Sequence, residues 1–110
     1  MNADVVNSDT AIIAKRAALV SDVVSLVRKK VPSAGDPITA HFGKRVAASW
    51  RSHGTTFEVD DDDDVLVTSS LRKDGRVFCK LVESVDEATL PESIANEVCV
   101  HLLRVEAVGE

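Results

Sequence analysis

Apolar residues near the N-terminus recur at steps of three and four, which is the spacing of one helical face. This pattern predicts an amphipathic helix from Thr10 to about Lys30, and we expect residues 1–8 to form a loose lead-in. A β-branched run at 23–27 also suits a strand, but strict alternation fails there, so the helix is preferred. The predicted face consists of Ile12, Ile13, Ala17, Val20, Val23, Val24, Val27 and Val31.

A second helix is predicted between Asp36 and Ser52. Asp36 and Pro37 are typical of a helix N-cap followed by proline at the first helical position. Four large apolar residues then follow at regular steps of four, and His53-Gly54 is typical of a helix end. The glycine inside this stretch costs about 1 kcal/mol relative to alanine. The apolar residues are Ile38, Phe42, Val46 and Trp50.

After Gly54 the period of the pattern changes to that of strands. Alternation over 55–59, 65–71 and 77–83 predicts three strands, and the Asp-Gly pair within 73–76 is a strong hairpin signal. Apolar residues that recur at steps of three and four from Pro91 to about Val105 predict a last helix. Runs of helices and strands indicate an α+β fold. We therefore expect two N-terminal helices, a three-stranded antiparallel meander and a C-terminal helix packed on the sheet, within one domain of 110 residues.

Composition constrains the core and the compartment. Three Phe, one Trp and no Tyr require an aliphatic core. Cys79 and Cys99 lie in apolar runs, and the chain shows neither a secretory signal nor a stretch apolar enough to span a membrane. Both cysteines are therefore expected to be buried thiols, and the protein to be cytoplasmic.

Charge divides the chain into two halves. Residues 1–53 hold eight Lys or Arg against four Asp or Glu, whereas residues 54–110 hold five against fourteen, which gives the net charge of −5. Such asymmetry is a hint about charged partners. The basic residues outside the apolar stripes favour either a solvated helix face or a phosphate-contacting surface on the first two helices. The residues of that surface would be Lys29, Lys30, Lys44, Arg45 and Arg51.

Five consecutive aspartates interrupt the strand pattern: Asp60, Asp61, Asp62, Asp63 and Asp64. An EF-hand loop would need glycine at the sixth position and glutamate at the twelfth, where this chain has Val65 and Leu71. The run is therefore expected in an exposed turn. It is a solvated turn, a loose cation site, or an acidic loop that docks a basic partner. We adopt the last as the functional hypothesis.

Signatures of catalysis and of metal binding are missing from the sequence. The five glycines occur singly, and no nucleophile or metalloprotease motif is present. Cys99 and His101 are two residues apart on a predicted helix, so they cannot chelate one metal together. We expect no cofactor, no metal and no enzymatic activity.

Apolar residues exceed what one small two-layer core requires. The strand at 77–83 has apolar residues on both faces, and the first and last helices have wide apolar faces. Such a surplus favours a symmetric homodimer. The sequence therefore predicts a small protein-interaction module, an adaptor, inhibitor or chaperone-like regulatory protein that self-associates. The alternatives are a nucleic-acid-binding protein and an enzyme of unknown class.

Overall fold

The computed structural model describes residues 2–60, 62, 64–70, 77–84 and 91–108, with side chains described for all of these except 2–9, 77–84 and 108. The elements in chain order are α1 (Asn2–Lys30), the 3-10 turn η1 (Pro32–Ala34), β1 (Ile38–Phe42), β2 (Arg45–Trp50), the 3-10 turn η2 (Arg51–His53), β3 (Thr55–Val59), β4 (Asp64–Ser70), β5 (Val77–Ser84) and α2 (Pro91–Val108). The α+β class with an antiparallel meander and a C-terminal helix is confirmed.

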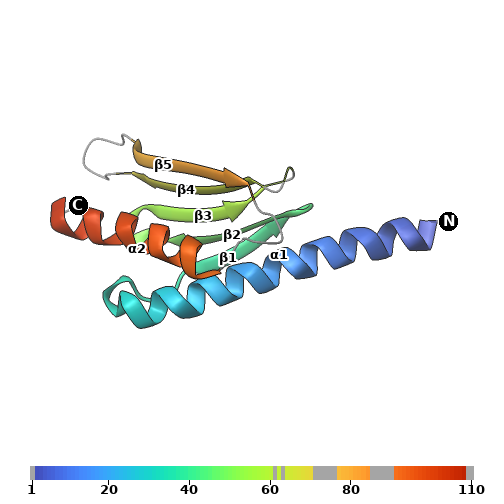
Figure 1. Cartoon of the computed structure of the whole chain (residues 1–110), viewed down its shortest axis with the longest axis horizontal. Coiled ribbons are helices and arrows are strands. Elements are labelled where there is room, and N and C mark those ends of the chain that lie inside the picture. Colours follow the sequence, from blue (N-terminus) through green and yellow to red (C-terminus); the bar gives the residue numbers. More distant parts are fainter. Residues whose placement is uncertain (1, 61, 63, 71–76, 85–90, 109–110) are drawn as a thin grey trace.

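Within the described residues the strands form one sheet in the order β1-β2-β3-β4-β5, and every neighbouring pair is antiparallel. Both helices lie on the same side of this sheet (Figure 1). Helix α1 packs against β2 and against α2, while α2 packs against β3 and β4. The N-terminal part of α1 extends beyond the ends of the strands (Figure 1).

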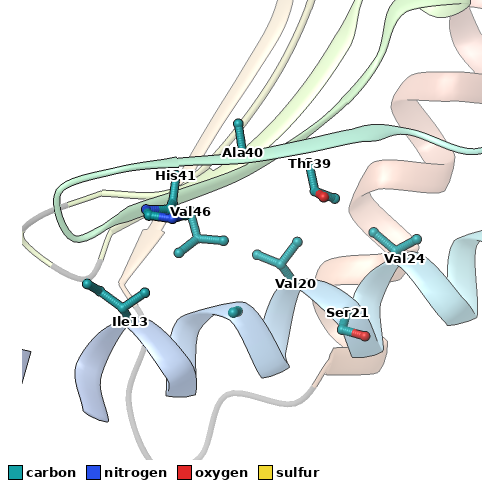
Figure 2. Close-up of a pocket in the computed structure, with 9 residues that line it drawn as sticks. Ile13, Val20, Ser21, Val24, Thr39, Ala40, His41 and Val46 are labelled. Carbon is teal, nitrogen blue, oxygen red and sulfur yellow. The ribbon is translucent and has the colours of Figure 1, made fainter. Parts of the chain in front are cut away.

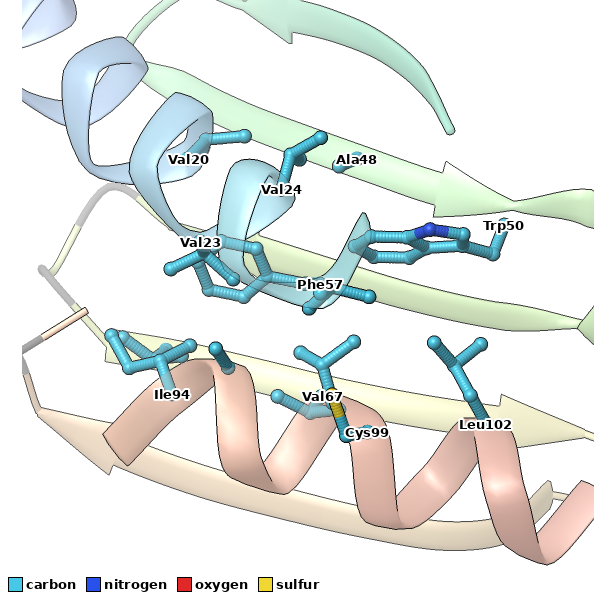
Figure 3. Packing of buried hydrophobic residues seen from close by; sticks show 14 of the residues in the cluster. Val20, Val23, Val24, Ala48, Trp50, Phe57, Val67, Ile94, Cys99 and Leu102 are labelled. Carbon is cyan, nitrogen blue, oxygen red and sulfur yellow. The ribbon is translucent and has the colours of Figure 1, made fainter. Parts of the chain in front are cut away.

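The core lies between the two helices and one face of the sheet. Alternate residues of the three central strands are buried there, as the period of a strand requires. Trp50 and Phe57 are the largest described side chains of this core, and most of the others are aliphatic (Figure 3), as the composition predicts. The helices contribute Val20, Val23, Val27, Ile94, Val98 and Leu102, and the strands contribute Val46, Ala48, Val59, Val65 and Val67.

The predicted helix between Asp36 and Ser52 is wrong. This segment is a hairpin in which β1 and β2 are joined by a two-residue turn at 43–44. Gly43 adopts a φ of +55°, which the primed hairpin turns require and a helix excludes. A step of four is also an even number, so it fits a strand as well as a helix. The hairpin places Phe42 opposite Arg45 and His41 opposite Val46.

That register divides the four apolar residues of the predicted stripe between two faces of the sheet. Val46 and Trp50 are buried under the helices, at 5% and 1% exposure. Ile38 and Phe42 lie on the opposite face, at 55% and 81% exposure. Of the four apolar residues that were predicted to form the buried side of a helix, two therefore belong to the core and two to the exposed surface.

The other predicted elements are confirmed, with shifts at their ends. The first helix begins at Asn2 instead of Thr10, so residues 2–8 are helical and the expected lead-in is wrong for them. The last helix extends to Val108. The predicted strands correspond to β3, β4 and β5. The predicted Asp-Gly turn within 73–76 lies outside the described residues.

Replacing Phe57 by alanine is expected to lower the free energy of unfolding by about 3–5 kcal/mol, because the ring is fully buried and its removal leaves a cavity. Urea denaturation followed by circular dichroism measures this change. Thr68→Ala, on the partly exposed face of β4, is the matched control and should change stability by less than about 1 kcal/mol. Equal losses for the two variants would contradict the described core.

Candidate functional site

A groove runs between α1 and the edge strand β1 (Figure 2). Its volume is about 320 Å³. It exists because α1 packs against β2 while every residue of β1 stays exposed. We call it the α1–β1 groove, and it is lined by Ile13, Ala17, Val20, Ser21, Val24, Thr39, Ala40, His41 and Val46.

The lining of the α1–β1 groove is mainly apolar. Val20, Val24 and Val46 are buried at its base. Thr39 and His41 of β1 extend toward α1, whereas Ala40 points to the opposite face of the sheet (Figure 2). An apolar concavity with few polar groups is typical of a binding surface.

The hairpin that forms one wall of this groove is fixed to the helix by a buried arginine. Arg16 is 6% exposed, and its guanidinium donates a hydrogen bond of 2.7 Å to the main-chain carbonyl of Lys44 in the hairpin turn. A hydrogen bond from a charged donor contributes more than a neutral one. The turn is therefore held against α1, and β1 is presented as an ordered edge.

The acidic loop, Asp60–Asp64, lies at the junction of β3 and β4. Among its described residues, Asp62 lies in an exposed turn as predicted, Asp60 follows β3 and is partly exposed, and Asp64 is already the first residue of β4. The Asp60 carboxylate accepts hydrogen bonds from the backbone N–H groups of Asp62 (2.9 Å) and Asp64 (3.0 Å). Carboxylate oxygens of Asp60, Asp62 and Asp64 all lie within 4.8 Å of one another. Three such oxygens could serve as part of the ligand set of a hard cation. Asp61 and Asp63 lie outside the described residues.

The five basic residues proposed to contact phosphates do not share one surface. Lys29 and Lys30 end α1, Lys44 lies in the hairpin turn, Arg45 begins β2 and Arg51 begins η2. Arg45 and Arg51 stand at opposite ends of a strand about 17–20 Å long. The predicted basic face of the first two helices is therefore wrong, because the second of those helices is a hairpin.

A cluster that the sequence did not predict joins η1, η2 and α2. We call it the His53 cluster: Ser33, Ser52, His53 and Glu106. The Nε2 atom of His53 lies 2.7 Å from Glu106 Oε2, and its Nδ1 atom lies 2.7 Å from Ser52 Oγ. Ser33 Oγ donates a 2.6 Å hydrogen bond to the same Glu106 oxygen. Hydrogen bonds from Ser33 and then His53 lower the pKa of Glu106.

The His53 cluster contains a serine, an imidazole and a carboxylate in hydrogen-bonded order, as nucleophilic triads do. Here the carboxylate also binds Ser33, and the cluster connects three elements that are separated in the chain, η1, η2 and α2. Its geometry accounts for how the C-terminal part of α2 is fastened to the turns. Residues 53 and 106 are far apart in the chain, so no local pattern could have predicted their contact.

A second histidine and a cysteine belong to the core. Ser69 Oγ lies 3.1 Å from Nδ1 of His101, which is 1% exposed, and burial lowers the pKa of that imidazole. Cys99 is a buried free thiol, and burial raises its pKa. The side chain of Cys79 lies outside the described ones. A free Cys99 confirms its predicted role as a small buried hydrophobe.

Comparison with known proteins gives no match: no family model, curated protein or solved structure is significantly similar to this chain. In the helical residues that the structure describes, no segment combines the length and apolarity that crossing a membrane requires.

The low pKa of Glu106 predicts a loss of stability in acid. The folded state lowers this pKa from 4.5, so the charged carboxylate stabilises the fold above that value. This contribution is lost as the pH falls through the folded-state pKa. Glu106→Gln should therefore show a smaller fall in unfolding free energy than the wild type between pH 7 and a pH below 4.5.

Chemical denaturation over this pH range measures the difference. Asp22→Asn is the control, because Asp22 is exposed on α1 away from the His53 cluster. The cluster as described is contradicted if Glu106→Gln keeps the full acid dependence of the wild type.

Proposed function

We propose that this protein is a non-enzymatic protein-interaction module that binds an extended segment of a protein partner along the free edge of β1. The supporting observation is the combination of an exposed edge strand with the apolar α1–β1 groove beside it. Addition of a strand to a sheet edge is a recurring mode of peptide recognition, in which backbone hydrogen bonds supply affinity and side-chain pockets supply specificity.

The backbone of β1 offers hydrogen-bonding groups to such a segment. A two-residue hairpin turn closes on a hydrogen-bonded pair, here Phe42 and Arg45. Because the pattern alternates along the strand, the N–H and C=O groups of Thr39 and His41 are directed to the free edge. A partner strand would therefore bond to these two residues without disturbing the pairing of β1 with β2.

The side chains of β1 supply the apolar component. Phe42 is 81% exposed and Ile38 is 55% exposed on the open face. Burying one large apolar side chain contributes about 1.5–3 kcal/mol. An adaptor, an inhibitor or a chaperone-like regulatory protein would each use a surface of this kind. The free thiol of Cys99 supports a reducing compartment such as the cytoplasm.

A photo-crosslinking residue tests this proposal in the cell that makes the protein. With benzoylphenylalanine in place of Phe42, we expect a covalent adduct to a protein, identified by mass spectrometry. The same residue in place of Leu103, which is 51% exposed on α2, is the matched control and should give far less adduct. Equal labelling at the two positions, or no protein adduct at Phe42, would overturn the proposed function.

The acidic loop is a second contact within the same proposed function. Its support is the close approach of the carboxylates of Asp60, Asp62 and Asp64, which concentrates negative charge at the β3–β4 turn. Clustered charge raises the association rate of an oppositely charged partner. A basic segment of the partner is the chemistry that fits it.

The double substitution Asp60→Asn and Asp62→Asn tests this contact, because Asn at position 60 keeps the side-chain oxygen that accepts the backbone hydrogen bonds of residues 62 and 64. Binding of a lysine-rich peptide, measured by fluorescence anisotropy at low salt, should weaken by about fivefold or more, which corresponds to about 1 kcal/mol. Binding that is unchanged by the substitutions and by added salt would remove the acidic loop from the proposal.

A further inference from the structure

We infer that the occupant of the β1 edge is a second copy of this chain, paired antiparallel through β1 about a two-fold axis that passes beside Ala40. This inference rests on the proposed function and names its partner. The reasons are the self-complementarity of the strand, the charges at its ends and the position of α1.

The strand is self-complementary in one register. Ala40 is the middle residue of the five in β1. With the axis there, Thr39 lies opposite His41 of the partner subunit, and His41 lies opposite Thr39 of the partner subunit. These are the two residues whose backbone groups point to the free edge, so both pairs are hydrogen-bonded pairs. Four new backbone hydrogen bonds form, and the two sheets become one.

The same register places apolar side chains of the two copies opposite each other on the sheet face that the helices do not cover. Ile38 lies opposite Phe42 of the partner subunit, and the relation is repeated by symmetry. Both side chains are largely exposed in one copy. A cross-strand pair of an aromatic and a β-branched residue contributes about 0.2–1 kcal/mol beyond an alanine pair.

Charges at the ends of β1 are complementary in this arrangement. In this register the hairpin turn of one copy, which contains Lys44, lies at the same end of the joined strands as Asp36 of the partner subunit, which is two residues before Ile38. Asp36 has a side chain 72% exposed, and it lies 2.8 Å from the guanidinium of Arg28. The basic hairpin turn of each copy is thus near the acidic residue that precedes β1 in the other copy, and the two-fold axis repeats this contact. Pro37 carries no N–H and ends the ladder.

The two α1 helices lie on the same face of the joined sheet, one on each side of the axis. In the joined sheet β2 and its symmetry mate lie three strand spacings apart, about 14 Å. Helices pack at about 8–10 Å. Helices centred over the two β2 strands would therefore be too far apart to pack directly, and the space between them over the central strands is formed by the two α1–β1 grooves. Ile13 and Ala17, which line the groove and are at least partly exposed in one copy, then face the same space from both copies.

Charge at the two-fold axis tests this inference on the full chain. Light scattering during size exclusion should give the wild type twice the single-chain mass of 11.8 kDa. Ala40 faces its own copy at a Cβ separation of about 4.5–5.5 Å, so Ala40→Glu and Ala40→Lys should each give the single-chain mass. An equimolar mixture of the two variants should recover the double mass.

Val100→Glu, at an exposed position on α2, is the control and should keep the double mass. Circular dichroism spectra equal to those of the wild type show that the Ala40 variants fold, because Ala40 is exposed. Single-chain mass for the wild type up to roughly millimolar concentration overturns the inference. Double mass in both Ala40 variants, with no effect of mixing, also overturns it.

These results separate the inference from the proposed function. A wild type of single-chain mass whose Phe42 position still labels a different protein refutes the homodimer and leaves the interaction module standing. If the wild type has twice the single-chain mass and the Ala40 variants do too, the dimer forms through a surface other than β1. Crosslinking from position 42 then tests separately whether β1 binds a protein partner.

Discussion

In the part of the chain that the structure describes, two helices pack on a five-stranded sheet and cover its central strands, and this constraint determines which surfaces the fold leaves open. Helix α1 packs over β2, and α2 packs over β3 and β4, so the buried face ends where the helices end. The core closes around Trp50 and Phe57 on the central strands. The edge strand β1 receives no cover, and a groove forms between it and α1. The candidate interaction surface is a consequence of how the core is built.

The parts of the fold that were predicted correctly are those in which the pattern has a single interpretation. The alternation in β3 and β4 excludes a helix, and the steps of three along α1 and α2 break strand alternation, so that the helix is preferred even across the β-branched run at 23–27. The segment from Ile38 to Trp50 fails this test, since steps of four satisfy both periods. The deciding signal was Gly43, whose positive φ makes a two-residue turn and which a helix would hold only at a cost.

The same ambiguity explains the success and failure of the site predictions. The acidic loop could be placed between two strands because five like charges exclude a strand centre, and the described aspartates lie at the junction of β3 and β4, with Asp64 as the first residue of β4. The basic surface could not, because it depended on a helix that is a hairpin. The α1–β1 groove and the His53 cluster arise from contacts between distant segments, which a local pattern does not encode. An apolar surplus was predicted for the helices and for the strand at 77–83, whereas the exposed apolar residues at the sheet edge are Ile38 and Phe42, which had been assigned to the buried stripe of a helix.

Amide hydrogen exchange of β1, resolved by NMR, tests most directly the claim that its free edge pairs with a second copy. The N–H groups of Ala40 and Phe42 bond to β2, so they should exchange slowly at every protein concentration. The N–H groups of Thr39 and His41 should exchange slowly at high concentration and become fast on dilution, as the copies separate. Fast exchange of Thr39 and His41 at every concentration would contradict the account.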